Sequence, residues 1–378
     1  MAAQRTMISP AYRLIAMCTR AIGSPSYYAA LRRMVEQFED WASLPELAEK
    51  HGMAALLYHH LRGADITIPM ETRTVLQGIV LRRQRHARAF MQATADILRA
   101  FNAAGVPLLV MKGVALGMLI YPDPMLRPLS DIDLAVAPAD LTRTLHLLRE
   151  LGYEVPESHI DSLIWRSVEG IPVTIDLKVG GESPAQTVFW ETASNDFAGF
   201  ADERQSFTCL GERGLTLGRE ALLIFLSRHL AKHLLKGSTT NPLRLIWIAD
   251  LVSYAEQFKS TLDWDKLDRF EPSLRGRLAT CAAYSQPDQR LPAGIDRYFH
   301  GWPHRSSAEL RAEGAFALVR QSCCPSEWWL RLYHGSTRQH PPTITLRMHH
   351  LGTLGRFALH RTLVRVPTLR WSRRVGMR

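Results

Sequence analysis

The sequence S-D-I-D-L-A-V at residues 130–136 places two aspartates one residue apart at the start of an apolar run. If residues 131–137 form a strand, the alternation of side chains puts Asp131 and Asp133 on one face and the apolar residues on the other. Two carboxylates on one face repel each other unless a cation lies between them. Mg²⁺ prefers oxygen ligands and leaves coordination positions for water and substrate phosphate. The stretch therefore predicts a strand with a buried back and a Mg²⁺ site on its polar face.

A third carboxylate occurs in V-T-I-D-L-K-V at residues 173–179. The apolar residues of this segment share one face of a predicted strand, so that Asp176 and Lys178 lie on the opposite face. A strand with an ordinary polar outer side is the alternative interpretation. An acidic residue in the middle of a β-branched strand is otherwise disfavoured, which favours a functional role.

Upstream, L-L-V-M-K-G at residues 108–113 leads into V-A-L-G-M-L-I-Y, which predicts a strand, a bend at Lys112 and Gly113, and then a helix. A glycine bend that enters a helix presents free backbone N–H groups suited to a triphosphate, and Lys112 adds positive charge there. Without the aspartates, a solvent-exposed lysine at a strand end is an equally good interpretation. The apolar run 106–121 is interrupted by Lys112 and is shorter than the ~20 residues that cross a bilayer, so no transmembrane segment is predicted.

The D-x-D spacing alone is weak evidence, because roughly one such pair is expected by chance in a chain of this length. Its context is more informative. In dehalogenase-like phosphatases and nucleotide-sugar glycosyltransferases the apolar strand runs into the D-x-D, whereas here it runs out of it, which disfavours both classes.

The surrounding sequence predicts an α+β protein. Residues 10–62 are amphipathic and helical in pattern, and a second helix is expected from Glu71 to Ala104, closed by Gly105. Short β-rich runs then alternate with turns up to residue 217, with one helix between Asp140 and Gly152, and helical patterns return from Arg219. The predicted organisation has four parts: an N-terminal helical region (1–104), a mixed α/β unit (105–217), a C-terminal helical domain (218–300) and an arginine-rich tail (301–378).

The charge of the chain is concentrated at its end. Of the net charge of +10, all comes from residues after Glu327, where ten arginines and no acidic residue occur, while the preceding residues hold 36 basic and 36 acidic side chains. We therefore expect the tail to make non-specific contact with an anionic partner, and the high isoelectric point says little about the body of the protein.

Cysteine and histidine spacings argue against structural metal sites or disulfides. The five cysteines are scattered and form no C-x-x-C pair, and the N-terminus has no secretory signal, so a reducing cytoplasmic location is expected. His229 and His233 share a helix face, but H-L-A-K-H lacks the glutamate of a zincin motif, which favours packing over zinc binding.

Taken together, an ordered set of motifs resembles the uncharacterised nucleotidyltransferase family of the DNA polymerase β-like superfamily. The resemblance spans roughly residues 75–270. It rests on these segments: K-G-V-A-L (112–116), Tyr121, Arg127, S-D-I-D-L (130–134), L-G-Y (151–153), I-D-L (175–177), H-L-A-K-H (229–233), L-R-L-I-W-I-A-D (243–250) and L-D-W (262–264).

The resemblance implies a polymerase β-like palm, a small mixed β-sheet with helices, flanked by the two helical regions. It implies that Asp131, Asp133 and Asp176 are catalytic and bind two Mg²⁺ or Mn²⁺ ions, with an NTP as the donor substrate. A second group of residues would contact the nucleotide: Lys112, Gly113, Arg127, Ser130 and Lys178. Two departures from the family pattern occur: Lys112 and Gly113 replace the superfamily's usual Gly-Ser pair, and Lys178 replaces a histidine common after the third carboxylate.

The expected function is Mg²⁺-dependent transfer of a nucleotidyl or phosphoryl group from an NTP to an unidentified hydroxyl or phosphate acceptor, such as a peptide natural product or a small metabolite. Two alternatives from other classes stay open. One is a catalytically silent nucleotide-binding regulatory module of the antitoxin-like kind. The other is a protein that binds nucleic acid through its basic tail.

Overall fold

The computed structural model describes residues 9–156, 164–179, 203–236 and 244–283. The arginine-rich tail, Cys323 and Cys324 lie outside the described residues, so the predictions made for them stay predictions. The three described cysteines are free thiols, and all of them are buried.

Four short helices begin the described chain: α1 (Pro10–Met17), α2 (Pro25–Val35), α3 (Leu44–Lys50) and α4 (Ala54–Gly63). The first two begin in the same way, with a serine followed by a proline in the first turn. The hydroxyl oxygens of Ser9 and Ser24 accept hydrogen bonds from the backbone N–H groups of Tyr12 and Tyr27, which satisfies donors that a helix start leaves free.

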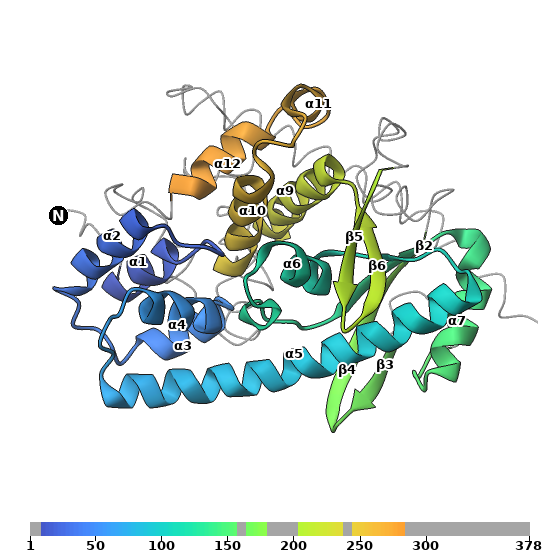
Figure 1. The fold of residues 1–378 in the computed structure, drawn as a ribbon, viewed down its shortest axis with the longest axis horizontal. Helices are drawn as coiled ribbons and strands as arrows, with labels where there is room; N and C mark the ends of the chain where they lie inside the picture. Colours follow the sequence, from blue (N-terminus) through green and yellow to red (C-terminus); the bar gives the residue numbers. More distant parts are fainter. Residues whose placement is uncertain (1–8, 157–163, 180–202, 237–243, 284–378) are drawn as a thin grey trace, which may run out of the picture.

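Helix α5 (Met70–Ala104) extends for 35 residues and ends at Gly105, whose left-handed conformation closes it. The predicted end at Ala104 is confirmed, and the helix begins one residue before the predicted Glu71. Figure 1 shows α5 running along one side of the molecule, from the N-terminal helices to the β-sheet.

The central sheet has four strands in the order β1-β2-β4-β3. Their bounds are β1 (Leu109–Val110), β2 (Ile132–Val136), β3 (Ile164–Val168) and β4 (Ile171–Val179). Strands β2 and β4 are parallel, whereas β1–β2 and β3–β4 are antiparallel, so the sheet is small and mixed. Helix α6 (Lys112–Ile120) follows β1, and α7 (Leu141–Glu150) follows β2. This arrangement confirms the predicted α+β class.

A second, two-stranded sheet joins the central region to the C-terminal helices. Strands β5 (Arg204–Cys209) and β6 (Glu212–Leu217) form an antiparallel hairpin through Leu210 and Gly211, both at positive φ. Four helices follow: α9 (Arg219–Lys236), α10 (Leu245–Phe258), α11 (Trp264–Phe270) and α12 (Leu274–Ala282). Short 3-10 turns at Pro124–Leu126 and Pro138–Asp140 complete the described elements.

The buried apolar residues form two clusters. One joins the N-terminal helices α1–α4 with α6 and the C-terminal helices α9, α10 and α12. The other lies between the second half of α5 and the central sheet. The two helical regions expected to flank the palm therefore pack against each other, with α5 shared between both clusters.

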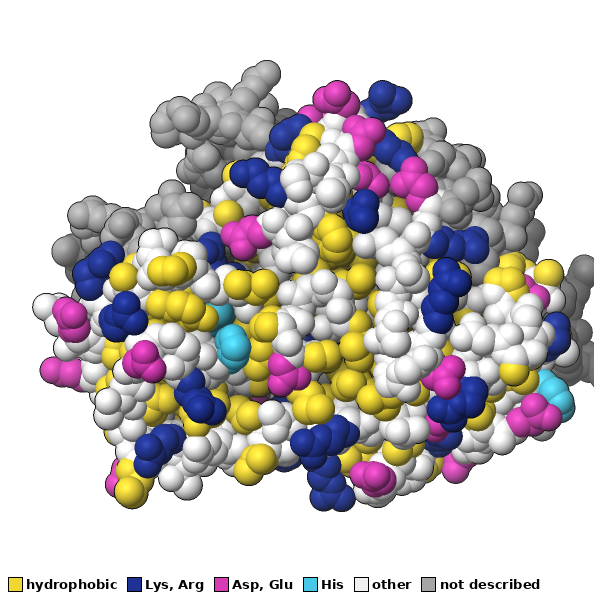
Figure 2. Space-filling view, viewed as in Figure 1, with side chains coloured by type: hydrophobic (Ala, Val, Ile, Leu, Met, Phe, Trp, Pro, Cys, Tyr) yellow, Lys and Arg dark blue, Asp and Glu magenta, His cyan; other side chains and the backbone are white. Residues whose placement is uncertain are grey.

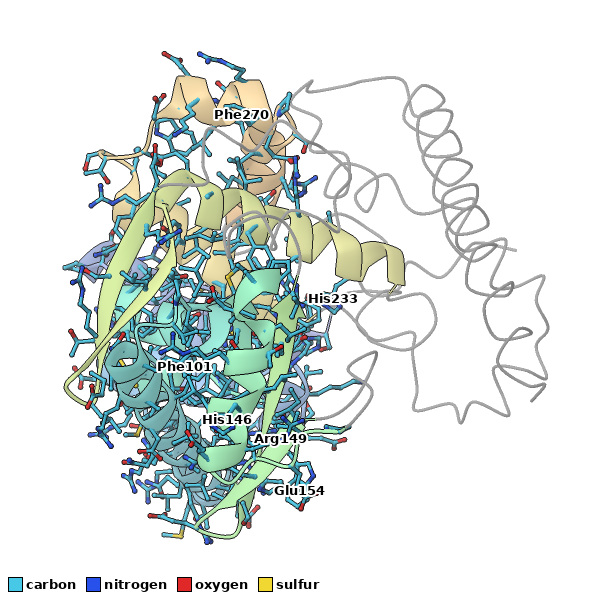
Figure 3. The ribbon with its side chains drawn as sticks, turned by 90° about the vertical axis from the view of Figure 1, so that its right-hand side faces the viewer. Phe101, His146, Arg149, Glu154, His233 and Phe270 are labelled. Atoms are coloured by element: carbon cyan, nitrogen blue, oxygen red, sulfur yellow. The ribbon has the colours of Figure 1, made fainter. Side chains whose placement is uncertain are left out.

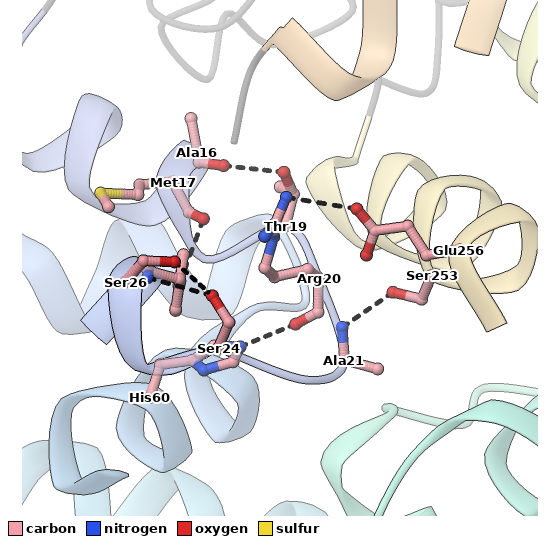
Figure 4. Close-up of polar contacts among 11 residues, drawn as sticks. Ala16, Met17, Thr19, Arg20, Ala21, Ser24, Ser26, His60, Ser253 and Glu256 are labelled. Carbon is pink, nitrogen blue, oxygen red and sulfur yellow. Dashed lines mark hydrogen bonds and ion pairs between the residues drawn. The ribbon is translucent and has the colours of Figure 1, made fainter. Parts of the chain in front are cut away.

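Polar contacts reinforce the contact between the two helical regions (Figure 4). In the segment after α1, Arg20 forms an ion pair with Glu256 of α10 at 3.3 Å, and the backbone N–H of Ala21 donates to Ser253 Oγ at 2.8 Å. The His60 ring nitrogen Nε2 lies 2.7 Å from the Arg20 carbonyl oxygen, which ties α4 to the same point.

Basic and acidic side chains are interspersed over the face of the molecule in Figure 2, in keeping with the balanced charge of the residues before the tail. Among the described residues, none of the helices combines the length and apolar character that crossing a membrane requires.

Candidate active site

The three predicted acidic residues come together at one edge of the central sheet. Asp133 of β2 is directly opposite Asp176 of β4 in the parallel register, and Asp131 immediately precedes β2. One carboxylate oxygen from each of the three lies within 4.8 Å of the other two. The alternation of side chains along the strands produces this arrangement, because the neighbouring Ile132, Leu134 and Ile175 are buried in the core.

Asp133 is the most deeply buried of the three acids, with a side chain only 1% exposed. Burial raises the pKa of Asp133 to about 6, and the neighbouring charges of Asp131 and Asp176 act in the same direction. Lys112 opposes this rise through an ion pair in which its Nζ lies 2.7 Å from Asp133 Oδ1. Lys112 reaches this position because it follows β1, which pairs antiparallel with β2.

Asp176 is more exposed and has its own lysine. Burial favours the neutral form of Asp176, but the charge of Lys178 and its hydrogen bond outweigh that effect and lower the carboxyl pKa. Lys178 Nζ lies 2.9 Å from Asp176 Oδ2, and the two residues share a face of β4, as predicted. Ser130 lies beside them, where its hydroxyl donates to Asp131 Oδ1 at 2.9 Å and its carbonyl accepts from Thr174 Oγ1 at 3.1 Å.

Gly113 forms the predicted bend at the start of α6. Its φ of 29° and ψ of −104° are not helical, and a Cβ at this position would lie 3.6 Å from the carbonyl oxygen of Asp131. Only glycine adopts this conformation without strain, and its lack of a side chain lets the bend approach the aspartate loop. Lys112, Gly113 and the three acids thus lie around one small region.

Arg127, which is predicted to contact phosphate, has a structural role as well. Its guanidinium is buried and engaged with Asp250 of α10, with Nε–Oδ1 at 2.9 Å and Nη2–Oδ2 at 2.8 Å. Its remaining nitrogen, Nη1, donates to the carbonyl of Pro128, and the Tyr121 hydroxyl donates to Asp250 Oδ1 at 2.7 Å. Arg127 therefore anchors the loop that leads to Asp131 onto α10, with three of its five N–H donors engaged within the protein. Its contact with phosphate stays a prediction.

Two residues near the site received no role from the sequence: Asp250 and Arg244. Both stand in the 243–250 segment that carried the family resemblance, but they are more than 100 residues from the D-x-D in the chain. No spacing signal connects them to Arg127 or Asp131, because the contacts depend on how α10 packs against the loop after α6.

His229 and His233 pack as aromatic rings. Their ring centroids are 4.4 Å apart, and the His233 ring lies 4.2 Å from that of Trp247 on α10. His233 lies near the end of α9 in Figure 3. These ring contacts agree with the packing interpretation of the two histidines. Among the described residues, the only group of three or more potential ligands that could hold a metal is the aspartate set.

The aspartate set fits a divalent cation. Its donors are carboxylate oxygens, the ligands that Mg²⁺ and Mn²⁺ prefer, and they converge from two neighbouring positions in the sheet. Lys112 and Lys178 each place a positive charge against one of these carboxylates, which is the compensation that closely spaced carboxylates require.

Comparison with known proteins identifies the family. The family model for an uncharacterised nucleotidyltransferase matches residues 37–282, which is more than half of the chain. Among curated proteins, no sequence match was found.

Two solved structures are similar over about half of the chain. The solution structure of the antibiotic-resistance factor ANT(2'')-Ia is 15% identical, with 51% of this chain and 94% of that chain covered and a TM-score of 0.32. The crystal structure of an antigenic nucleotidyltransferase-like protein from Paracoccidioides brasiliensis is 14% identical, with 56% and 97% covered and a TM-score of 0.30. TM-scores this low carry no argument about function. The family match does, and the chain belongs to the uncharacterised nucleotidyltransferase family and is an enzyme of that class.

Proposed function

We propose that the protein transfers a nucleotidyl group from an NTP to a hydroxyl or phosphate acceptor, with divalent metal ions held by Asp131, Asp133 and Asp176. The observation that carries this proposal is the convergence of the three carboxylates within 4.8 Å at one edge of a mixed sheet. In the reaction, an acceptor oxygen bonds to the α-phosphorus, the bond from that phosphorus to the β-phosphate oxygen breaks, and pyrophosphate leaves.

The carboxylates would hold Mg²⁺ or Mn²⁺, which when bound would lower the pKa of the acceptor hydroxyl and neutralise charge on the leaving group. Asp176 is the acid best suited to receive the acceptor proton, because it is the more exposed of the two acids paired with lysine. Asp133, its buried register partner, is held by the ion pair with Lys112 until a bound metal ion compensates its charge.

The remaining nucleotide contacts would come from the residues around the acids. Lys112 and Lys178 can turn from their carboxylates to phosphate oxygens once a metal ion compensates the acids. The bend at Gly113 brings backbone close to Asp131 and would let a phosphate approach without a side chain in the way. The Ser130 hydroxyl would orient Asp131.

Transfer of radiolabel tests the proposal. Purified full-length protein is incubated with Mg²⁺, a cell extract and an NTP labelled at either the α- or the γ-phosphate. We expect label from the α-position to appear on an acceptor, and we expect Asp133→Asn and Asp176→Asn to abolish this transfer. Label from the γ-position alone would indicate phosphoryl transfer instead.

The matched control is Asp140→Asn, which removes the same charge beyond the other end of β2. Asp140 makes no side-chain capping bond to α7 and should be dispensable. If wild type binds NTP but transfers no label from either position, the silent regulatory module becomes the better account. If Asp133→Asn labels the extract as wild type does, the proposed site is wrong.

A further inference from the structure

Arg244 has an unusual position beside the candidate active site. It stands immediately before α10, and its Nη2 lies 2.7 Å from the place that a Cβ on Gly52 would occupy. Pro128, in the loop that leads to Asp131, lies 3.2 Å from the same place. The guanidinium therefore lies close to the α3–α4 junction and near Pro128, in a space that exists because residue 52 is glycine.

Among the residues that the structure describes, Arg244 differs from comparable arginines in having no carboxylate partner. Within the described ranges, every other arginine that is buried or half-buried forms an ion pair with an aspartate or glutamate. These arginines are Arg20, Arg83, Arg127, Arg166, Arg228 and Arg277. Arg244 is also half-buried, yet among the described residues it makes neither an ion pair nor a hydrogen bond through its side chain.

The charged residues around Arg244 also act on its guanidinium. Burial lowers the pKa of Arg244, and the nearby positive charges of Arg127 and Arg83 lower it further. The carboxylates of Asp250 and Asp131 act in the opposite direction. Asp250 is already bound by Arg127 and Tyr121, so it is not free to pair with Arg244, whose charge an anion would neutralise.

We propose that Arg244 binds the β- and γ-phosphates of the NTP whose α-phosphate lies at the Asp131–Asp133–Asp176 edge. The inference rests on the proposed function, because it assumes that the edge holds a triphosphate. Arg244 is near enough for Asp131 to act on its charge but makes no ion pair with it. A triphosphate extends beyond the carboxylate edge, and the guanidinium fork can hold its distal oxygens with two parallel hydrogen bonds.

Binding measurements with the full-length chain in Mg²⁺ test this inference. ATP, GTP, CTP and UTP are titrated by calorimetry, together with inorganic tripolyphosphate and the monophosphate of the best-binding base. For Arg244→Gln we expect the Kd for the triphosphate and for tripolyphosphate to rise roughly 10- to 100-fold, the loss typical of a charge-assisted bidentate contact. The Kd for the monophosphate should stay within twofold, and the melting temperature should not fall, because no ion pair is lost.

Two further variants complete the experiment. Arg244→Lys keeps the charge without the fork and should lose less affinity than Arg244→Gln. Arg269→Gln removes an exposed arginine from α11 and should bind all ligands as wild type does.

The outcomes separate this inference from the proposed function. If wild type binds a triphosphate and Arg244→Gln binds it equally well, the role of Arg244 is wrong and the proposed function survives. If Arg244→Gln weakens the binding of triphosphate and of monophosphate equally and also lowers the melting temperature, Arg244 has a structural role and the inference is wrong. If wild type binds no triphosphate in Mg²⁺, the proposed function and the inference fail together.

Discussion

At the level of single residues, Asp133 and Asp176 have similar positions but different environments. Their side chains are 1% and 45% exposed, although they are register partners on adjacent strands. Burial holds the pKa of Asp133 at about 6, whereas Lys178 lowers that of Asp176. In the absence of metal, Asp133 is therefore the acid that changes charge closest to neutral pH.

This difference predicts a pH dependence of stability. The pKa of Asp133 is higher in the folded chain than in the unfolded chain, so the folded state holds the proton more tightly between about pH 4 and pH 6. The free energy of unfolding of the protein therefore falls as the pH rises through that range. A pKa rise of this size corresponds to roughly 3 kcal/mol, so that metal-free wild type should lose roughly 2–3 kcal/mol relative to Asp133→Asn between pH 4 and pH 7. Urea unfolding at several pH values in EDTA measures this difference.

Mg²⁺ should oppose this loss of stability at the higher pH, because a carboxylate must be deprotonated to bind a metal ion. The stabilisation by Mg²⁺ should therefore grow from pH 5 to pH 7.5 in wild type and be small in Asp133→Asn. If the free energy of unfolding depends on pH in the same way in wild type and Asp133→Asn, with or without Mg²⁺, the environment of Asp133 is not as described.

The acids of the site could be predicted from sequence because strand alternation and an apolar back are local patterns. The buried ion pair of Arg127 could not be predicted from sequence, for the complementary reason. Its partner, Asp250, lies 123 residues further along the chain, and an arginine close to a D-x-D looks the same whether it points to a ligand or into a buried ion pair. No sequence pattern marks Arg244 for the same reason, since only the three-dimensional structure shows that it has no ion-pair partner among the described residues.

At the level of elements, α5 is long enough to contribute residues to both apolar clusters, and it contains one position with low helix propensity. Gly78 lies on an exposed face of the helix, and a Cβ there would meet nothing within 4 Å. Glycine in a helix interior costs about 1 kcal/mol relative to alanine. Gly78→Ala should therefore raise the free energy of unfolding by roughly 0.5–1 kcal/mol, measured by urea denaturation.

Gly117 of α6 provides the matched control for this prediction. A Cβ at Gly117 would lie 3.3 Å from the carbonyl oxygen of Pro124 and 3.4 Å from its Cβ. The gain in helix propensity would then be offset by displacement of the Pro124–Leu126 turn, so Gly117→Ala should not stabilise the protein. If both substitutions have the same effect, the close packing of α6 on that turn does not control stability.

Element prediction succeeded where a single pattern was strong and missed β3. The bounds expected for α5 agree with the structure to within one residue, and the strand expected over 173–179 lies within β4. Strand β3 includes Arg166 and Ser167, and only its first residue is fully buried, so it lacks the alternation that marks a half-buried strand. Its pairing with β4 depends on the tight turn at Glu169 and Gly170, both at positive φ.

At the level of the whole molecule, the helical regions before and after the palm form one apolar cluster. The sequence contains both sets of amphipathic helices, but the central sheet and the β5–β6 hairpin separate them in the chain. Tertiary packing decides which apolar faces meet, and the periodicity of the sequence alone cannot predict it. The consequence for function is that α10 and the loop of the D-x-D are held together by residues from distant parts of the chain.

The Arg127–Asp250–Tyr121 group is the main polar connection between that loop and α10. Removal of one partner leaves a buried charge without compensation, so Arg127→Met should lower the free energy of unfolding by roughly 3–5 kcal/mol. Tyr121→Phe removes one neutral donor and should cost roughly 1–2 kcal/mol. The double variant Arg127→Met with Asp250→Leu replaces the pair by apolar side chains and should recover most of the loss, as measured by urea unfolding.

The same double variant separates stability from activity. Gly113 and the carbonyl of Asp131 lie next to the Arg127 guanidinium, since a Cβ on Gly113 would be 3.9 Å from Arg127 Nη1. Without the ion pair the loop loses its fixed orientation, so the double variant should be folded but should transfer nucleotide at least tenfold more slowly, a loss of about 1.4 kcal/mol in transition-state stabilisation. A double variant that is as stable and as active as wild type would mean that the position of the acidic edge does not depend on α10.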